Sequence, residues 1–415
     1  MAESVTTVIR GAHPDEREQI ARLYAGVFST PDMPYDMLYA LNREGYVQEP
    51  GFRHEHTRVV VRDGQVIAQV KVNPFAIHYG AATLTAAGLG DVCTHPDHRG
   101  QGHATDLMRD TLAYVADIGC DLALLNGVTD YYHRFDFANA WPYRHVDVYA
   151  ADTDRLTRAP ASALALRAMT DDDIPAMLAL YNRTWPAHPG ARIRDAAYLA
   201  WKLSGFNTKK VVAVDDAGQL RGYMVDWWTP GAVCEVVAAS ADATAAFLRA
   251  SAATVRAAYG DDDAAFRWFV PPDAPAARHA RRLCPVEIME RSRPGGGWMA
   301  RLIDLPRTVE KLLPELEARV QRSPYADWAG YLRLETDLGH VTLALSHGRI
   351  MTGRHTRQSL VAQMRQTDLV ELMFAYSTPA EVAAQAHAHI DREALGLLRA
   401  LFPPVVSGMA GIDWF

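Results

Sequence analysis

The pattern of hydrophobic and polar positions predicts the same succession of strands and helices twice along the chain. The first copy has a short apolar run at 8–10, a polar turn, and a helical apolar stripe over 20–28. The second copy repeats this with a run at 165–167 and a stripe over 177–185. Both predict a strand, an Asp-rich helix start and an amphipathic helix. The matching positions share one offset: Arg10/Arg167, Asp15/Asp172, Leu23/Leu180, Tyr24/Tyr181 and Phe28/Trp185.

A hairpin pattern follows in each copy. Apolar runs at 59–61 and 66–68 flank Asp63-Gly64, a tight-turn pair. In the second copy, runs at 211–214 and 220–225 flank an acidic turn. The alternative is chance similarity of two strand–helix units. The repeated order favours two related α/β domains, residues 1–150 and 160–292.

A third unit, with a different order of predicted elements, follows the glycine run at 294–297. Such a run is typical of a linker. A charged amphipathic helix is predicted over 305–320, followed by three short strands between 331 and 352. Helices rich in Ala, Leu and Glu then run to residue 401. We therefore expect an α+β domain over 298–415, unrelated to the two copies.

Composition sets the class of protein. The 415 residues are 49% hydrophobic and 22% charged, the balance of a globular chain, so disordered and fibrous classes are excluded. A net charge of -7 argues against a general binder of nucleic acid or anionic membrane. The four scattered cysteines form no CxxC pair, the N-terminus has no apolar signal, and no run is long enough to span a membrane. We expect a cytoplasmic protein.

The segment that carries chemistry is residues 98–104, His-Arg-Gly-Gln-Gly-His-Ala. A strand is predicted to end near Thr94 and a helix to begin near Gly102. Such a turn aims backbone N–H groups and a helix N-terminus at an anion, and the glycines let a bulky pyrophosphate approach. The alternative is a solvent loop. No Gly-Lys-Ser/Thr follows, which excludes a P-loop, and the position after several strands excludes a dinucleotide fold.

This Arg-x-x-Gly-x-Gly pattern, after late antiparallel strands, resembles the main coenzyme A motif of the GNAT superfamily of acetyltransferases. The resemblance implies acetyl-CoA as co-substrate, and two strands that splay apart beside the pantetheine arm. It also implies a backbone N–H near Val92 for the tetrahedral oxyanion. The cofactor-binding candidates are Val92, Cys93, Thr94, Arg99, Gly100, Gln101, Gly102, His103, Ala104, Thr105, Gly127 and Val128.

The same segment carries residues typical of two other kinds of chemistry. His95, His98 and His103 are spaced permissively for a metal, but no Cys or carboxylate cluster completes a tetrahedral set, so no metal is predicted. They are expected in solvent or near the phosphates. Cys93 could be imagined as an acyl carrier, although a strand cysteine is usually a small buried hydrophobe.

A second motif, Tyr132-His-Arg-Phe135, follows the buried strand at 121–125. It matches the Tyr-bearing helix after the fifth strand of GNAT proteins. A tyrosine can protonate a leaving thiolate because its pKa, about 10, lies near that of a thiol. Tyr131 competes for this role, and adjacent helix positions point in different directions. The register with Arg134-Phe135 favours Tyr132, and the alternative is an aromatic that only packs.

The whole chain resembles one GNAT branch, the Eis-like (enhanced intracellular survival) acetyltransferases. That resemblance implies tandem GNAT folds, with mixed, mostly antiparallel sheets flanked by helices, plus a sterol-carrier-like α+β C-terminal domain. It implies that the terminal carboxylate, here on Phe415, acts as general base; the alternative is an apolar tail that only packs. The second copy has no Arg-x-x-Gly-x-Gly/Ala at 239–244, so one acetyl-CoA per chain is expected.

Departures from the family pattern concern the acceptor. The chain has Gly100-Gln101 where an arginine is common, and Phe135-Asp136-Phe137 where Phe-Gly-aromatic is common. The acidic residues of an aminoglycoside pocket are not clearly matched. The acceptor-binding candidates are Phe28, Asp32, Asp36 and Asp413.

The sequence therefore predicts an N-acetyltransferase that moves acetyl directly from acetyl-CoA to a primary amine, of aminoglycoside-like, polyamine or lysine type. Tyr132 is the predicted acid and the Phe415 carboxylate the predicted base. We expect no nucleic-acid or membrane partner and, from the resemblance, a homo-oligomer such as a hexamer. The alternatives are a lipid carrier that uses the sterol-carrier-like domain, and an acyl-CoA-binding protein with an inactive site.

Overall fold

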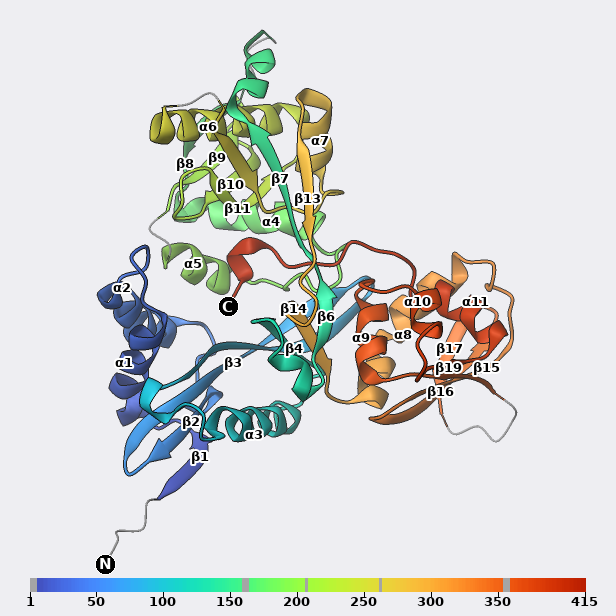
Figure 1. Ribbon diagram of the computed structural model, residues 1–415. Coiled ribbons are helices and arrows are strands. Elements are labelled where there is room, and N and C mark those ends of the chain that lie inside the picture. The colour runs from blue at the N-terminus through green and yellow to red at the C-terminus, as the bar shows by residue number, and fades with distance from the viewer. Residues whose placement is uncertain (1–5, 159–163, 206–207, 261–262, 354–358) are drawn as a thin grey trace, which may run out of the picture.

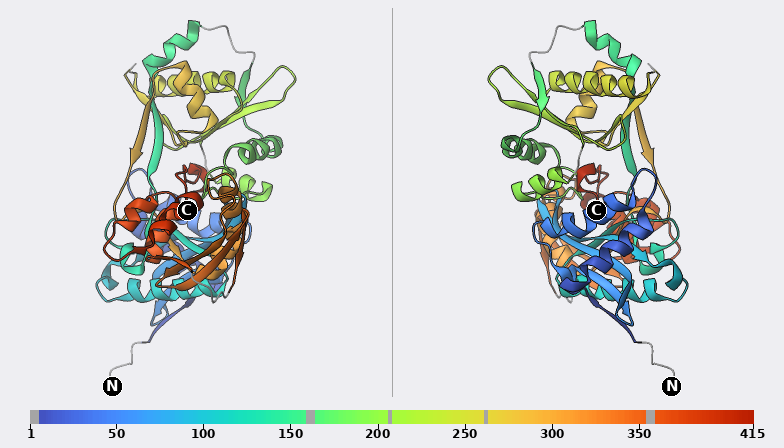
Figure 2. Two further views of the ribbon diagram at one scale, coloured as in Figure 1. Left: turned by 90° about the vertical axis from the view of Figure 1, so that its right-hand side faces the viewer. Right: turned by 90° about the vertical axis from the view of Figure 1, so that its left-hand side faces the viewer.

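The computed structural model describes residues 6–158, 164–205, 208–260, 263–353 and 359–415. Three mostly antiparallel sheets with flanking helices make up the molecule, which confirms the expected mixed α/β class (Figure 1). The second sheet stands above the first, and the third lies beside the first (Figures 1 and 2). None of the helices in these ranges is both long and apolar enough to cross a membrane.

The first sheet has seven strands, and β4 and β5 are its one parallel pair among the described strands. Helices α1 and α3 cover opposite faces, because alternate residues of the strands point to opposite sides. Val60 packs with α3 in one cluster, whereas its neighbours Val59 and Val61 pack with α1 in another. In sheet order the strands are β1 (Thr7–Gly11), β2 (Thr57–Arg62), β3 (Gln65–Tyr79), β4 (Ala82–Thr94), β5 (Leu122–Gly127), β14 (Gly297–Leu302) and β6 (Ala138–Trp141), with α1 (Arg17–Phe28), α2 (Tyr35–Ala40) and α3 (His103–Asp117).

The second sheet repeats this order, with β11 and β12 as its parallel pair. The predicted strand–helix repeat is present, and both copies contain the same ion pair at corresponding positions. Arg10 pairs with Glu16 and Arg167 pairs with Asp173, in each case through two guanidinium nitrogens. Its strands are β13 (Glu287–Arg291), β7 (Tyr143–Tyr149), β12 (Ala265–Trp268), β11 (Ala232–Ala238), β10 (Leu220–Asp226), β9 (Lys210–Val214) and β8 (Ala165–Ala168), with α4 (Ile174–Thr184), α5 (Ala196–Ser204), α6 (Ala241–Tyr259) and α7 (Pro275–Leu283).

The third sheet docks on the far ends of β3 and β4. Tyr79 Oη donates to the carbonyl of Met373 at 2.8 Å, and Glu315 accepts from the N–H of Ala81 at 2.8 Å. The strands and helices predicted from 305 onward are present. They are β17 (Arg349–Thr352), β16 (Gly339–Ser346), β15 (Gly330–Thr336), β18 (Leu360–Gln363) and β19 (His389–Ile390), with α8 (Leu305–Gln321), α9 (Gln366–Met373), α10 (Pro379–Ala383) and α11 (Arg392–Leu401).

The first two sheets cross the expected units 1–150, 160–292 and 298–415, because β7 belongs to the second sheet and β14 to the first. Strands β6 and β7 follow one another along one antiparallel ribbon with β14 and β13, and this ribbon runs through both sheets (Figure 1). The glycine run expected as a linker is instead a turn within the ribbon. Asn139 fixes the turn by donating to the carbonyls of Arg293 and Gly296 and accepting from the N–H of Gly295. The first two units are therefore joined by shared strands.

Candidate active site

The turn between β4 and α3 has the form of an anion cradle. One turn of 3-10 helix, Pro96–His98, leads to Gly100 and Gly102, whose φ angles are 75° and 87°. A side chain at either glycine would meet no atom within 4 Å, so the left-handed backbone, not crowding, requires glycine here. Helix α3 then begins at His103, and the backbone N–H groups of His103 and Ala104 have no acceptor within the helix, whereas that of Thr105 already donates to Gly102. The predicted loop thus presents backbone donors to open space.

Most side chains of this loop are held by the protein. Arg99 Nε donates to the carbonyl of Thr94 at 3.2 Å. Gln101 Oε1 accepts from Arg62 at 2.9 Å, and Thr105 Oγ1 accepts from Arg134 at 3.3 Å. By contrast, Nδ1 of His98 and Nε2 of His103 are buried and have no hydrogen-bond partner among the described residues. The backbone N–H groups of the loop are therefore its open donors, whereas these two imidazole nitrogens are covered by protein.

Strand β4 has an open edge beside this loop. Its parallel pairing with β5 stops at Gly88 and Leu124, whereas its pairing with β3 continues through Cys93 and Thr94. Backbone groups of β4 beyond Gly88, including Val92, therefore have no β5 partner, which is the splay expected from the resemblance. Burial raises the pKa of the Cys93 thiol, so it is not poised as a nucleophile.

Tyr132 lies on the β5 side of the gap between β4 and β5, in a 3-10 turn (Tyr132–Phe135) after β5. Its ring covers Gly127, where an added Cβ would lie 2.6 Å from Cδ2 of Tyr132. The side chain is 7% exposed, and burial raises the pKa of its phenol, so the hydroxyl keeps its proton at neutral pH. Tyr131 is half-buried beneath the guanidinium of Arg134. Val128, after Gly127, is largely exposed.

The chain terminus reaches the open edge of β4. The carboxyl carbon of Phe415 lies 3.3 Å from where a Cβ of Gly90 would be, and the ring lies 2.7 Å from where a Cβ of Gly88 would be. The same ring packs against Phe75 and Trp298, with centroids 5.6 and 5.8 Å apart. These glycines make room for the terminus. The structure thus brings together the carboxylate and the strand expected to hold the thioester.

Sequence reasoning missed a stripe of buried polar side chains on β3 beside this terminus. Gln69, Lys71 and Asn73 are each at most 9% exposed. Lys71 Nζ donates to Glu49 at 2.7 Å, whereas both amide atoms of Gln69 are buried without a partner among the described residues. The signal was present, because a polar residue at every second position of an apolar strand marks one face.

Asp91 is a second residue that the sequence did not single out. Its φ is 54°, an unusual conformation for an aspartate within a strand, and it lies where the β3–β4 register shifts. Its Oδ2 accepts from Asn42 at 3.3 Å. Burial raises the pKa of this carboxyl to about 6, although Lys71 and Arg17 act to lower it.

The acceptor candidates lie in three different places. Phe28 is half-buried at the end of α1, with its ring 5.1 Å from that of Tyr24. Asp32 and Asp36 are exposed, near the start of α2. Asp413 is fully buried, and its carboxylate is taken up by Arg194 and Tyr198. The structure therefore gives Asp413 contacts within the protein instead of an open face toward an acceptor.

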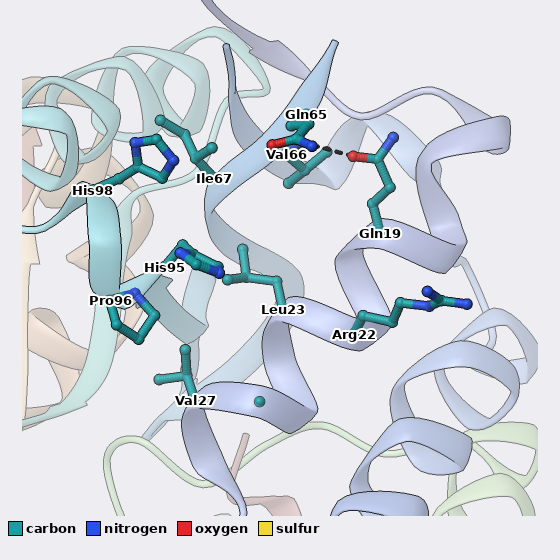
Figure 3. Close-up of a pocket in the computed structure, with 11 residues that line it drawn as sticks. Gln19, Arg22, Leu23, Val27, Gln65, Val66, Ile67, His95, Pro96 and His98 are labelled. Atoms are coloured by element: carbon teal, nitrogen blue, oxygen red, sulfur yellow. Dashed lines mark hydrogen bonds between the residues drawn. The ribbon is translucent and has the colours of Figure 1, made fainter. Parts of the chain in front are cut away.

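A groove of about 540 Å³ lies next to the loop but on the α1 side of the sheet (Figure 3). Leu23 and Val27 of α1 face His95 and Pro96 across it, and Gln19 is tied to the N–H of Val66 at 2.8 Å. The groove borders β3 and the loop, whereas the open edge of β4 faces β5. It is thus separate from the position of the terminal carboxylate.

Comparisons with known proteins address the family match and the fold. Residues 8–140 match the family described as Acetyltransferase (GNAT) domain. No curated protein matches the chain. Among solved structures, the GCN5-related N-acetyltransferases from Anabaena variabilis (TM-score 0.72) and Kribbella flavida (TM-score 0.70) are each 19% identical to the chain. Each alignment covers 99% of this chain and 100% of the other.

A third similar structure is Eis1 from Mycobacterium abscessus, with a TM-score of 0.63, 16% identity and the same coverage. At such identities the likeness concerns the fold, and it extends over all three sheets. Among the described residues, no group of three or more His, Cys, Asp or Glu side chains is placed to hold a metal. Residues 8–140 thus match the GNAT acetyltransferase domain family, and the fold is shared along the whole chain with these structures.

Proposed function

We propose that this protein is an N-acetyltransferase that moves the acetyl group of acetyl-CoA directly to a primary amine. The observation that carries the proposal is the Phe415 carboxylate beside Gly90, on the open edge of β4. Donors for the pyrophosphate, an exposed strand edge for the pantetheine arm and a base for the amine then lie along one strand. The acceptor is aminoglycoside-like, a polyamine or a lysine side chain.

The chemistry follows from these positions. The terminal carboxylate takes the proton of the acceptor ammonium, and the neutral amine attacks the thioester carbon. A backbone N–H near Val92 stabilises the tetrahedral oxyanion, a contribution of about 3 kcal/mol in comparable sites. The Tyr132 hydroxyl gives its proton to the departing thiolate, and the raised pKa of this phenol keeps that proton available. No covalent enzyme intermediate is required.

The proposal includes tandem GNAT folds and a sterol-carrier-like third unit. The repeated strand order and the matched Arg10–Glu16 and Arg167–Asp173 pairs support the tandem origin. In the second unit the first turn of α6 is capped by Ser240, whose Oγ accepts from the N–H of Ala243 at 3.2 Å. A side chain thus occupies the position of the cradle, which supports one acetyl-CoA per chain. A cytoplasmic homo-oligomer completes the proposal.

Release of free thiol from acetyl-CoA tests the function. We expect turnover with at least one of kanamycin, spermidine and a lysine-containing peptide, and mass spectrometry should show one added acetyl group. Binding of acetyl-CoA without thiol release would favour the acyl-CoA-binding alternative. Failure to bind acetyl-CoA, with binding of a fluorescent fatty acid, would favour a lipid carrier.

The cradle predicts a difference between two glycines at opposite ends of α3. Gly102→Ala places a side chain at φ 87°, which strains the loop by about 1 kcal/mol and turns its N–H groups away. We expect acetyl-CoA to bind about tenfold more weakly by calorimetry. Gly119→Ala is the matched control, because Gly119 has a φ of 79° and equally open surroundings at the far end of the helix. Equal affinities in the two variants would contradict the cradle.

Tyr132→Phe separates catalysis from binding. The variant keeps the ring on Gly127 and removes the proton donor, so kcat should fall about 100-fold while the Kd for acetyl-CoA stays within about twofold. The rate of thiol release gives kcat, and calorimetry gives the Kd for acetyl-CoA. Tyr131→Phe is the control and should behave as wild type. The reverse pattern would transfer the role to Tyr131.

A further inference from the structure

The tail after α11 crosses the second unit before it reaches the first. It returns from the third unit and ends between the first and second sheets (Figures 1 and 2). The N–H of Gly408 donates to the carbonyl of Pro189 at 2.9 Å. Gly411 lies so near β11 that a Cβ there would be 2.3 Å from the carbonyl oxygen of Cys234. Residues of the second unit therefore guide the last segment of the chain.

One arginine of the second unit holds this segment by its side chain. Arg194 Nη2 and Nε donate to the Asp413 carboxylate at 2.8 and 3.0 Å. Arg194 also donates to both oxygens of Glu235 on β11, at 2.9 and 2.6 Å. Tyr198 Oη donates to Asp413 at 3.1 Å, and Tyr223 donates to Glu235. The Arg194, Glu235 and Asp413 side chains are completely buried.

This group is not explained by a need for stability alone. Removing charges from water is expensive, and replacing a buried ionic group by packed apolar side chains is often neutral or stabilising. The tail already has apolar anchors, because Ala410 and Ile412 lie in the core of the second unit. What paired charges add is one defined arrangement, since a guanidinium fork fits two carboxylates in a single geometry.

The group formed by Arg194, Glu235 and Asp413, called the clamp below, lies close to the terminal carboxylate of Phe415. Asp413 precedes Phe415 by two residues, which span at most about 7 Å of extended chain. Between them, the carbonyl of Trp414 accepts from Lys202 Nζ at 3.0 Å, and Lys202 is a further residue of the second unit. Any shift of Asp413 would thus move the terminal carboxylate relative to Gly90.

We propose that Arg194 is a positioning residue for acetyl transfer: braced by Glu235, it fixes Asp413 and so sets the place of the Phe415 carboxylate beside Gly90. This inference rests on the proposed function of that carboxylate as the base. It gives the second unit, whose counterpart of the phosphate cradle is closed by Ser240, a task in the reaction of the first. The base is then presented by one unit to the thioester site of the other.

Asp413→Asn is the variant that tests the clamp. Replacing Arg194 would leave two carboxylates buried without a cation, and such a chain could fail to fold. Asp413→Asn instead leaves Arg194 and Glu235 as a neutral pair and loosens only the tail. Ser407→Ala is the matched control: Ser407 is equally buried in the tail, and its hydroxyl has no partner among the described residues.

Turnover is measured with acetyl-CoA and kanamycin, spermidine or a lysine peptide, whichever the wild type acetylates fastest. At pH 7 we expect kcat of Asp413→Asn to fall about 100-fold, with an unchanged KM for acetyl-CoA and a melting temperature near that of wild type. The deficit should shrink as the pH rises toward the pKa of the acceptor amine, because an amine that is already neutral needs no base. A purely structural defect would be independent of pH, and that result would overturn the proposal.

A chain with one glycine added after Phe415 separates this inference from the function beneath it. If that chain is inactive and Asp413→Asn is fully active, the base stands and the clamp is wrong. If both variants keep full turnover, the base itself is wrong, and the clamp has no catalytic task. Loss in both, with the pH dependence described, supports the two together.

Discussion

Adding a single glycine after Phe415 is expected to lower turnover by about 1,000-fold while acetyl-CoA still binds. The carboxyl carbon lies against Gly90, and the ring is enclosed by Gly88, Phe75 and Trp298. An extra residue converts the Phe415 carboxylate into a neutral amide and moves the charge one residue away from its place beside Gly90. Loss of a positioned base commonly costs 10²- to 10⁴-fold, and misplacement of the ring adds to that loss. The rate of thiol release measures turnover, and calorimetry measures the binding of acetyl-CoA.

Phe415→Leu is the companion variant for this experiment. It keeps a terminal carboxylate and an apolar side chain that is smaller than the ring now packed against Gly88, so turnover should stay within about tenfold of wild type. The pair therefore distinguishes the charge at the terminus from the packing of the last side chain. An extended chain that turns over normally would remove the terminal carboxylate from the mechanism.

Local patterns predicted the parts of this site that lie within one stretch of sequence. The glycines of the β4–α3 turn, the tyrosine after β5 and the order of elements in each copy all depend on neighbouring residues. The left-handed φ angles of Gly100 and Gly102 match the residue type that only such a turn requires. Periodicity and turn chemistry suffice for features of this kind.

Features that depend on pairing between distant segments were not predicted. Residues 294–297 are glycine-rich and thus typical of a linker, but Asn139 holds them as a turn in a ribbon between β13 and β14. The position of Asp413 depends on Arg194, more than 200 residues away in the chain. Nothing in either local sequence indicates the partner. For such contacts the tertiary fold, not local propensity, decides the outcome.

Asp91→Asn is expected to make the protein more stable at pH 8, with the gain disappearing toward pH 4. The pKa of this carboxyl is about 6 in the folded protein against 3.8 in the reference state. The folded state therefore holds the proton more tightly. Stability contributed by protonated Asp91 is complete below pH 4 and is lost as the pH rises through 6. The shift corresponds to about 3 kcal/mol, and asparagine avoids the loss because it cannot ionise.

Asp63→Asn is the matched control for this measurement. Asp63 also has a left-handed backbone, with a φ of 49°, but it is exposed in the β2–β3 turn. Its replacement should change the free energy of unfolding by less than about 0.5 kcal/mol at any pH. Urea unfolding of both variants at pH 4, 6 and 8 supplies the comparison. A loss of stability for Asp91→Asn at pH 8 would show that the charged carboxylate is favoured where it lies.

The expected gain also bears on why an aspartate is present at position 91. A charge that weakens the fold at neutral pH, in a backbone conformation that strains it, is typical of a site shaped by its chemistry. Asp91 follows Gly90 directly, and the carboxyl carbon of Phe415 lies against Gly90. A carboxyl with a pKa of about 6, one residue along β4 from Gly90, changes its charge near pH 6. Asp91→Asn should therefore alter the acid limb of the turnover profile even as it raises stability.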